Sequence, residues 1–341
     1  MVHQPASSSR GNKSARIVFV GDVMLGRLVS QELHRRPAEG FWGDVRPLLQ
    51  DVDAVIANLE CAITTSKEPW SRTPKVFHFG ADPRAIDVLR AGNVRAVSLA
   101  NNHVLDFETA GLLETIDLLE KAGIAHAGAG HTETEALAPA ILDIGGLKLA
   151  LLAVTDNEPA FAARADQPGT AYVDLDYRRE AISTIETGVI ASREAGADLL
   201  VLSCHLGPNM VLRPPTPIRE FRHAAVAKGI DLVQGHSAHV TQGVERDGRS
   251  LILHDTGDFL DDYAVDPVLH NDWSFVFLVE VEAASLRRLT LIPVRLGFAE
   301  VRLALPHESR EICARMTKLS AELGTGLVPS PDGLSLDLSP S

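Results

Sequence analysis

Short apolar runs rich in Val, Ile and Leu recur along the chain, and each of them ends in a cluster of polar residues. Apolar runs of about four to eight residues that are bounded by turn-forming residues are typical of buried β-strands. We therefore predict five strands, at residues 16–20, 53–57, 95–100, 198–204 and 230–234.

Segments with helical periodicity lie between these runs. Their apolar residues recur every three or four positions, which places them on one face of an α-helix. Pro83 suits a first helical turn, and Gly123 and Gly196 suit left-handed C-caps. The predicted helices occupy residues 83–92, 108–123 and 177–196. Because strands that alternate with helices form parallel sheets covered by those helices, the pattern predicts an α/β fold.

The C-terminal third of the chain has a different pattern. Three apolar runs, at residues 250–260, 274–283 and 288–297, follow one another without a helical segment between them. Closely spaced runs of this kind predict antiparallel strands that extend the sheet.

The ends of the chain differ in composition from its middle. Residues 1–15 and 324–341 are rich in Ser, Pro and Gly, so we predict a disordered N-terminal tail and a loose C-terminal tail. A single domain is expected over residues 16–323. The N-terminal segment has no apolar core of a signal peptide, and the longest core-like run, at 147–154, is far shorter than the roughly 18 residues of a membrane helix. These features predict a cytoplasmic protein without a membrane segment.

Composition and charge narrow the possible partners. The 341-residue chain has 45% hydrophobic residues and a formal net charge of −13, an acidic balance that argues against binding to nucleic acid. Three widely spaced cysteines form neither a disulfide framework nor a C-x-x-C motif, and we interpret them as buried thiols. They are Cys61, Cys204 and Cys313.

Carboxylate, amide and imidazole side chains follow the predicted strands. Taken singly, a histidine at the end of a strand is more often structural, and an aspartate after glycine more often caps a turn. Five clusters after five strands favour a shared site instead, because the carboxyl ends of parallel strands lie at one edge of a sheet. Such mixed oxygen and nitrogen donors suit one or two divalent ions, with Mn, Fe and Zn favoured. The candidate residues of this metal site are Asp22, Asn58, Glu60, Asn102, His103, His205, His236 and His239.

Several motifs together resemble one known family over about residues 16–262. They read GDVMLGR, NLECAIT, ANNHVLDFETAGLLETIDLLEKAGIAHAGAG, HLG and GHSAHVTQGVE. The chain is similar to the poly-γ-glutamate capsule biosynthesis (CapA-type) family, which resembles the calcineurin-like metallophosphoesterases. This resemblance implies a four-layer α/β/β/α sandwich of the metallophosphoesterase type. It also implies a two-metal centre held by Asp22, by Glu60 or Asn58, and by Asn102, His205, His236 and His239.

The sequence departs from the expected motifs at several positions, among them Met24, residues 205–209, which read HLGPN where His-Trp-Gly-x-Glu is usual, and Asp258. Met24 stands where the first motif usually has histidine, which predicts a weaker second metal position. Asp258 replaces the asparagine of an expected Gly-Asn-Phe. His254, Asp255 and Asp258 either orient the metal-binding imidazoles or form a polar turn, and the sequence does not decide between these roles.

The resemblance implies a metal-dependent hydrolase. Water held by the metal would attack a phosphoester, or a γ-glutamyl amide or related acyl group, of a small-molecule or acidic polymer substrate. His103 would stabilise the developing charge or protonate the leaving group, and Asp106 either orients His103, which we favour, or caps the next helix. Two alternatives remain open. One is a non-catalytic accessory protein that binds an acidic polymer or a synthase, and the other is an enzyme that modifies a small peptide or metabolite.

Overall fold

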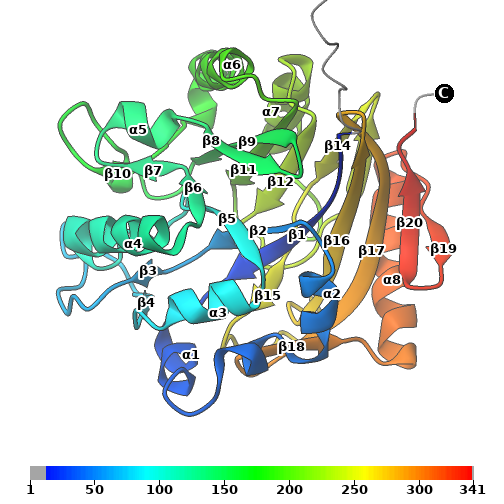
Figure 1. The fold of residues 1–341 in the computed structure, drawn as a ribbon, viewed down its shortest axis with the longest axis horizontal. Helices are drawn as coiled ribbons and strands as arrows, with labels where there is room; N and C mark the ends of the chain where they lie inside the picture. The colour runs from blue at the N-terminus through cyan, green and yellow to red at the C-terminus, as the bar shows by residue number, and fades with distance from the viewer. Residues whose placement is uncertain (1–12, 340–341) are drawn as a thin grey trace, which may run out of the picture.

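Two β-sheets pack face to face in the computed structural model, which describes residues 13–339 (Figure 1). The larger sheet has ten strands, in the order β19-β20-β17-β16-β1-β2-β5-β6, with β15 beside β1 and β18 beside β17. Its strands are β1 (Ser14–Val23), β2 (Ala54–Leu59), β5 (Val94–Ser98), β6 (Ala125–Ala127), β15 (Asp258–Leu260), β16 (Trp273–Glu282), β17 (Ser285–Gly297), β18 (Glu300–Leu303), β19 (Val328–Ser330) and β20 (Gly333–Asp337).

The smaller sheet has six strands in the order β13-β14-β12-β11-β9-β8. Its strands are β8 (Ala140–Ile144), β9 (Leu147–Thr155), β11 (Leu199–His205), β12 (Leu232–His236), β13 (Val244–Asp247) and β14 (Ser250–Leu253). Two short pairs complete the strands of the described chain: β3 (Ala62–Ile63) with β4 (Gly80–Ala81), and β7 (Ala129–Gly130) with β10 (Gly169–Thr170).

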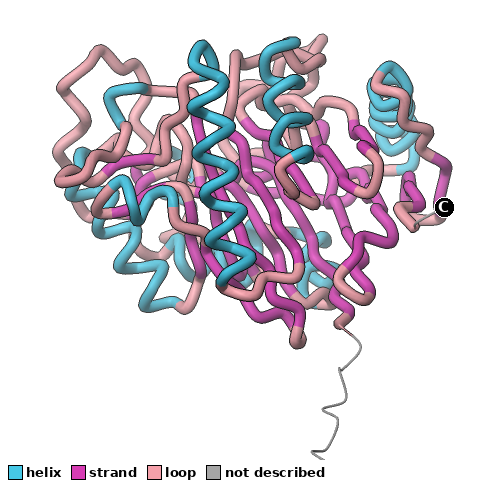
Figure 2. Tube along the Cα trace, turned by 90° about the horizontal axis from the view of Figure 1, so that it is seen from above, coloured by secondary structure: helices cyan, strands magenta, loops and turns pink. Residues whose placement is uncertain are grey.

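Helices cover the outer face of each sheet, as the view from above also shows (Figure 2). Apolar side chains of α1 (Arg27–Glu32), α2 (Arg46–Gln50), α3 (Ala85–Ala91) and α4 (Glu108–Ala122) pack on the larger sheet. Those of α5 (Glu133–Leu137), α6 (Arg178–Glu194) and α7 (Thr216–Ala227) pack on the smaller sheet. The predicted four-layer α/β/β/α arrangement is therefore confirmed.

The remaining helix, α8 (Pro306–Glu322), lies beside the two sheets. Its Ile312 and Met316 belong to the apolar core between the sheets. Between residues 13 and 339, four 3-10 helices lie in the connections, at Ala38–Phe41, Gly43–Val45, Pro159–Phe161 and Leu175–Tyr177.

Strand β1 shows why these runs are apolar at successive positions. Ile17 and Phe19 face the core between the two sheets, whereas Val18 and Val20 face the core under the helices. Side chains alternate between the faces of a strand, so a strand that is buried on both faces needs apolar residues throughout. An uninterrupted apolar run therefore indicates a central strand, and the first polar side chain after the run lies at the carboxyl end of that strand.

The predicted elements agree with the structure, with two corrections in the C-terminal third. The three predicted helices correspond to α3, α4 and α6, and the five predicted strands to β1, β2, β5, β11 and β12. β16 and β17 are antiparallel as predicted, but the run at 250–260 contains two strands, of which β14 pairs in parallel with β12 and β15 in parallel with β1, so the antiparallel prediction is wrong for these pairs. A short loop after β14 takes the chain from the smaller sheet to the larger one, where β15 begins.

The loose C-terminal tail is also a wrong prediction for most of its length. β19 and β20 form a hairpin, and β20 pairs with β17 from Leu334 to Asp337. Leu334, Leu336 and Leu338 alternate with polar residues, and all three are buried. This alternation outweighs the high Ser and Pro content of the segment. Of the predicted N-terminal tail, residues 14 and 15 belong to β1, and residues 1–12 lie outside the described chain. Residues 340 and 341, at the end of the predicted C-terminal tail, also lie outside it.

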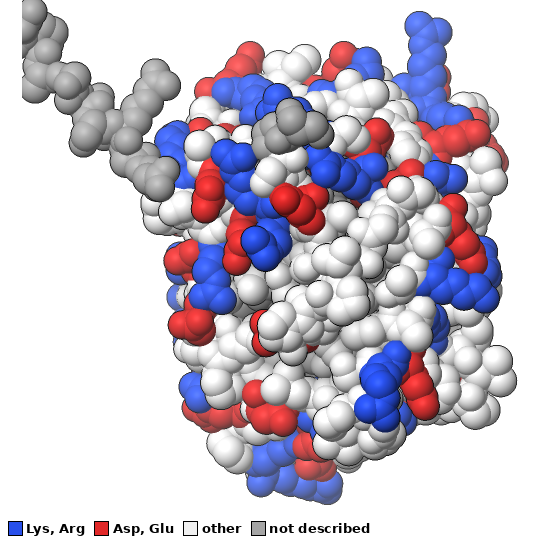
Figure 3. All heavy atoms as spheres, turned by 90° about the vertical axis from the view of Figure 1, so that its right-hand side faces the viewer, with Lys and Arg blue, Asp and Glu red and all other residues white. Residues whose placement is uncertain are grey.

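The surface and the helices bear on the possible partners. Figure 3 views the side formed by α8, β19 and β20, where basic and acidic side chains are interspersed rather than gathered into a basic surface of the kind that binds nucleic acid. Within residues 13–339, none of the helices combines the length and the apolar character that crossing a bilayer requires.

Candidate metal centre

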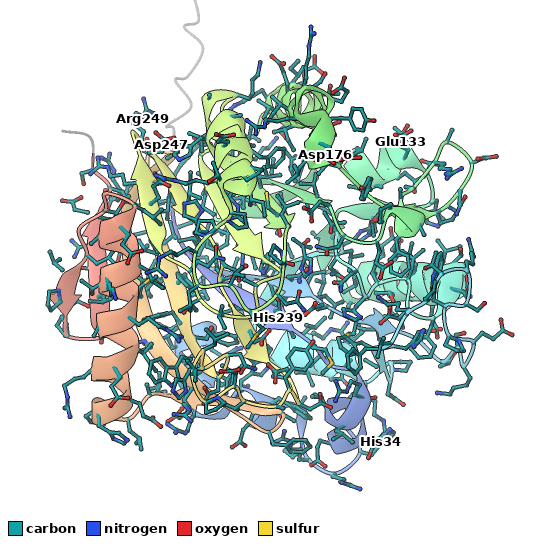
Figure 4. The ribbon with its side chains drawn as sticks, turned by 180° about the vertical axis from the view of Figure 1, so that it is seen from behind. His34, Glu133, Asp176, His239, Asp247 and Arg249 are labelled. Atoms are coloured by element: carbon teal, nitrogen blue, oxygen red, sulfur yellow. The ribbon has the colours of Figure 1, made fainter. Side chains whose placement is uncertain are left out.

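Buried polar side chains from both sheets meet where their parallel strands end. Asp22 lies near the end of β1, Asn58 near the end of β2 and Glu60 one residue beyond it, while His205 and His236 are the last residues of β11 and β12. All five are at most 1% exposed. His239 follows in the loop after β12 and lies near the middle of Figure 4.

Asp22 contacts most members of this group. Its Oδ1 accepts hydrogen bonds from His236 Nδ1 at 2.8 Å and from Asn58 Nδ2 at 2.9 Å. Its Oδ2 lies 3.6 Å from His239 Nδ1 and accepts no hydrogen bond from the described residues. One carboxylate oxygen is therefore used to orient two side chains, and the other is left without a donor.

Glu60 faces two imidazoles but is hydrogen bonded to neither. Its Oε1 lies 3.9 Å from His205 Nε2 and 4.0 Å from His239 Nε2. Within the described chain, both of its carboxylate oxygens are buried without a hydrogen-bond donor. Ligands that share one ion at bond lengths of about 2.0–2.2 Å are themselves about 3–4 Å apart, so these separations suit a shared ion.

Asp258 is a member of the cluster that the sequence left undecided. It is the register partner of Asp22 in the β1–β15 pair, and its Oδ1 accepts a hydrogen bond from His239 Nδ1 at 2.8 Å. Ligand atoms of Asp22, Glu60, His239 and Asp258 all lie within 4.8 Å of one another. The signal in the sequence is the carboxylate that replaces an amide in Gly257-Asp258-Phe259.

Two glycines permit this close approach of β1 and β15. A Cβ atom at Gly21 would lie 1.9 Å from the carbonyl oxygen of Gly257, which no rearrangement of a flexible side chain could relieve. Gly257 itself has a φ of +65°, a left-handed conformation that glycine adopts at little cost. Glycine at these positions therefore lets Asp22 and Asp258 lie side by side.

The loop after β12 is also held in an unusual conformation. Ser237 and His239 have φ values of 96° and 56°. Asp255 stabilises this loop, because its carboxylate accepts hydrogen bonds from the backbone N–H of Ala238 and of Gly257, each at 2.9 Å. Asp255 thus orients the segment that carries His239. His254 instead contacts Glu245 and Arg222, away from the cluster.

Buried polar atoms without partners test whether a metal ion fits here. Because an unpaired buried polar atom costs about 1–3 kcal/mol, a group of them at one place indicates a missing partner of opposite charge. Oxygen and imidazole nitrogen donors of this kind suit Mn, Fe or Zn. Within residues 13–339 the unpartnered atoms at these strand ends and the adjoining loop are Asp22 Oδ2, Glu60 Oε1 and Oε2, Asn102 Oδ1, His236 Nε2 and Asp258 Oδ2.

Burial and mutual repulsion shift the pKa values of these groups. Burial, together with the charges of Asp22 and Asp258, raises the pKa of Glu60 well above its usual range. Burial raises the pKa of Asp258 to about 6, against the opposing effect of His239. Burial lowers the pKa of His205 to about 3, so its imidazole is neutral. For Asp22 the neighbouring histidines outweigh burial and hold its pKa below its usual range.

The two candidate amide ligands differ in what they bind. Asn58 has protein partners at both ends of its amide, since Nδ2 donates to Asp22 and Oδ1 accepts from Asn101 Nδ2 at 3.0 Å. Asn101 also accepts a hydrogen bond from the backbone N–H of His103 at 3.0 Å, so it connects β2 to the loop after β5. Asn102 presents a buried Oδ1 that lacks a partner in the described chain.

His103 and Asp106 form a hydrogen-bonded pair beside the cluster. His103 Nδ1 donates to Asp106 Oδ2 at 2.6 Å, and the same oxygen accepts the backbone N–H of Phe79 at 2.7 Å. The Phe79 ring stacks on the imidazole with centroids 3.7 Å apart. Burial, with the charge of Lys75, keeps the pKa of His103 well below its usual value. Asp106 therefore orients His103, and α4 begins at Glu108 without a side-chain cap.

Lys75 and Phe79 belong to the site but were not predicted. Lys75 Nζ lies 3.3 Å from Asp106 Oδ1 and donates to the backbone oxygen of Asn102 at 2.6 Å. Its side chain is only 5% exposed. Both residues come from the long connection between β3 and β4, where neither strand nor helix periodicity indicates which side chains turn inward.

Met24 acts as a structural residue. It is fully buried, and its Sδ accepts a hydrogen bond from the backbone N–H of Gly26 at 3.1 Å. A thioether is a poor ligand for hard or borderline ions, so this position adds packing rather than a metal donor. His34, by contrast with the clustered histidines, lies at the periphery of the molecule (Figure 4).

Comparison with known proteins places the chain in a family. The family model described as "Bacterial capsule synthesis protein PGA_cap" matches residues 16–263, so the chain belongs to this family of capsule synthesis proteins and the resemblance in its motifs is confirmed. A "Probable polyglutamine synthesis accessory protein" of Mycobacterium tuberculosis is 27% identical over 93% of this chain and 94% of its own length. The "Capsule biosynthesis protein CapA" of Bacillus anthracis is 27% identical over 74% of this chain and 61% of its own length.

Solved structures show a more distant likeness. A hypothetical protein from Thermus thermophilus has a TM-score of 0.46 and 16% identity, and covers 83% of this chain and 100% of its own. A 5'-nucleotidase precursor from the same organism has a TM-score of 0.44 and 12% identity, and covers 91% of this chain and 59% of its own.

Proposed function

We propose that this protein is a metal-dependent hydrolase that acts on a phosphoester, or on a γ-glutamyl or related acyl bond, in polyglutamate-related capsule synthesis. The observation that carries the proposal is the convergence of buried, unpartnered carboxylate and imidazole atoms at the strand ends of two sheets. Membership of the capsule synthesis family supplies the biological setting.

The donors divide into atoms that would bind an ion and atoms that orient those donors. The Nε2 atoms of His205, His236 and His239 would bind the metal together with Glu60, Asp22 Oδ2 and Asp258 Oδ2, and Asn102 would add its Oδ1. The Nδ1 atoms of His236 and His239 donate to Asp22 and Asp258, which fixes each ring with Nε2 free. Asn58, whose amide is used at both ends, would orient Asp22 rather than bind metal.

Catalysis would combine the ion with a positioned imidazole. A bound divalent ion supplies a Lewis acid that lowers the pKa of water and polarises the oxygen under attack. Asp106 holds the proton of His103 on Nδ1, and among residues 13–339 His103 Nε2 has no hydrogen-bond partner. His103 Nε2 is therefore the atom that would exchange a proton with the substrate or stabilise its developing charge.

A second candidate function is that of a non-catalytic accessory protein. The Mycobacterium tuberculosis relative, which carries the words "accessory protein" in its name, aligns with almost the whole chain. In that case the centre would bind metal and an acidic ligand without turning it over. Metal binding is shared by both proposals, and turnover separates them.

The test measures metal content and turnover in the same samples. Purified protein would be analysed for Mn, Fe and Zn, and then assayed with p-nitrophenyl phosphate and with γ-glutamyl-p-nitroanilide. We expect metal-dependent turnover that is lost in a folded His205→Ala variant and kept in the control His34→Ala. Bound metal without turnover of either probe would favour the accessory function. Absence of metal together with absence of activity would contradict both proposals.

A further inference from the structure

Arg27 extends over three aromatic rings beside the candidate metal centre. Its guanidinium carbon lies 5.7 Å from the ring centroid of Phe77, 5.6 Å from that of Phe79 and 6.0 Å from that of Tyr263. Distances of up to about 6 Å are those at which a cation is attracted to the face of an aromatic ring. The rings therefore restrict where this guanidinium can lie.

Two of the same rings contact residues of the centre. Phe79 stacks on His103 with an interplanar angle of 18°, and Tyr263 lies edge-on to His239 with ring centroids 5.5 Å apart. Arg27 is thus separated from the candidate proton donor and from a candidate metal ligand by a single ring in each case. A ligand that extends past one of these rings would contact both Arg27 and the centre.

The hydrogen-bonding capacity of Arg27 is only partly used. Its Nε lies 3.4 Å from Asp262 Oδ1, and the backbone N–H of Leu28 donates to Asp262 Oδ2 at 2.9 Å. Across residues 13–339 the two terminal nitrogens of Arg27 have no hydrogen-bond acceptor, and the side chain is 35% exposed. Asp262 therefore pairs with the inner nitrogen as an ion pair without a hydrogen bond, and the outer pair stays available in the planar geometry that matches a carboxylate.

The charges around the centre also require a local cation if the substrate is an anion. The chain has a net charge of −13, and Asp22, Glu60 and Asp258 lie together in the cluster. One divalent ion bound among these three carboxylates offsets their charge only in part, so a further carboxylate is repelled unless another positive group lies close to the site. Both Lys75 and Arg27 are paired with carboxylates, but the Lys75 side chain is only 5% exposed, whereas that of Arg27 is 35% exposed and can reach a ligand.

We propose that Arg27, held near Phe77, Phe79, Tyr263 and Asp262, binds a carboxylate of the substrate, of the kind that a γ-linked glutamyl chain presents. This inference rests on the proposed function, because it assumes that the ligand is bound at the metal centre. Arg27 sets specificity for the acidic ligand. The exposed Phe77, 57% accessible, lies next to the same position and offers an apolar surface for the methylene groups of such a chain.

The test compares two probes of nearly the same size, of which one carries carboxylates and the other uncharged amides. Binding of γ-L-glutamyl-L-glutamate and of its fully amidated analogue to the Mn²⁺-loaded protein would be measured by calorimetry. We expect Arg27→Gln to weaken binding of the acidic peptide roughly 10- to 100-fold and to change binding of the amide less than about twofold. The control Arg35→Gln removes an exposed arginine paired with Glu32 and should change neither affinity. Metal content should be the same in all proteins.

Arg27→Lys keeps the inference testable if Arg27→Gln does not fold. Lysine keeps the positive charge but lacks the planar pair of donors, so Arg27→Lys should bind the acidic peptide more weakly than the wild type and bind the amide equally well. Equal weakening of both probes, an unchanged affinity for the acidic peptide, or a wild-type protein that binds both probes equally would overturn the inference.

The same samples separate this inference from the proposed function. Binding of the acidic peptide that depends on Arg27, without hydrolysis of the peptide or of p-nitrophenyl phosphate, would support the role of Arg27 and contradict the hydrolase. Turnover of p-nitrophenyl phosphate with no preference for the acidic peptide would support a metal-dependent hydrolase and overturn the role of Arg27.

Discussion

Asp258 lies directly beside Asp22, as its register partner in the parallel pair formed by β15 and β1. Both residues are fully buried, and each accepts a hydrogen bond from a histidine of the centre, His239 or His236. Two buried carboxylates on neighbouring register positions repel one another unless a cation or a proton lies between them. With Asp258, the centre has three carboxylates, because Asp22 and Glu60 are the other two. The same protein has Met24 at the position where the superfamily usually has a histidine ligand.

Replacement of Asp258 should therefore weaken metal binding. Asp258→Asn keeps an acceptor for His239 Nδ1 but removes the negative charge, and we expect roughly 10- to 100-fold weaker Mn²⁺ binding by calorimetry. Asp258→Ala should lower the affinity further, because the imidazole loses its orientation as well. The control is Asp266→Asn in an exposed turn. An unchanged affinity in both Asp258 variants would show that this carboxylate is not part of the metal site.

His103 should affect turnover much more than metal content. His103→Gln removes the group that exchanges a proton and leaves the proposed ligands in place, so we expect turnover to fall about 10²- to 10⁴-fold with metal retained. His236→Ala should lose metal and activity together. Metal analysis and rates measured on both variants check this difference. Loss of metal in His103→Gln as complete as in His236→Ala would make His103 a ligand, and full activity would make it structural.

Metal binding should strengthen as pH rises through about 6. Protons and metal ions compete for the same carboxylates, and the pKa of Asp258 is raised to about 6 while that of Glu60 is raised well above its usual range. Below these pKa values the carboxylates are protonated in the folded protein, so an ion must displace protons and binds more weakly. The increase in melting temperature on adding Mn²⁺ should be small at pH 5 and larger at pH 7.

The pH dependence has its own control. In Asp258→Asn one of the titrating carboxylates is absent, so the increase in Mn²⁺ stabilisation between pH 5 and pH 7 should become less steep. Stabilisation by Mn²⁺ that is equal at both pH values in the wild type would indicate that the ion binds elsewhere.

The close approach at Gly21 gives a prediction about stability. Gly21→Ala would place a Cβ atom 1.9 Å from the carbonyl oxygen of Gly257, so β1 and β15 would have to separate. We expect a loss of roughly 3 kcal/mol in the free energy of unfolding, together with weaker metal binding. Gly326→Ala is the control, because a Cβ atom there meets nothing within 4 Å. Urea unfolding of both variants measures the difference, and equal stability would contradict the clash.

The sequence predicts the positions that follow regular strands better than those in loops. Asp22, His205 and His236 could be found because each comes directly after an apolar run buried on both faces, and parallel strands end at one edge. Glu60 could be found in the same way, because it comes shortly after the apolar run at residues 53–57. Asp258 could not be decided in this way, because its strand has only three residues and the chain crosses from the smaller sheet to the larger one just before it.

Loop residues of the site lacked any periodic signal. Lys75 and Phe79 come from the connection between β3 and β4, and Tyr263 from the segment after β15, where the fold of distant elements decides which side chains turn inward. The C-terminal hairpin illustrates the opposite error. Its Ser and Pro content suggested a loose tail, although Leu334 and Leu336 already alternated as in a strand. Hydrophobic alternation was the stronger signal there than composition.

The most direct measurement of the central claim is an anomalous-difference map from crystals grown with Mn²⁺. We expect a peak within bonding distance of Glu60 and of the Nε2 atoms of His205 and His239, where buried donors face one another at 3.9 and 4.0 Å. The peak should disappear in crystals of His205→Ala. A map with Mn²⁺ bound only at other places, or with none bound in the wild type at saturating Mn²⁺, would contradict a metal centre at these strand ends.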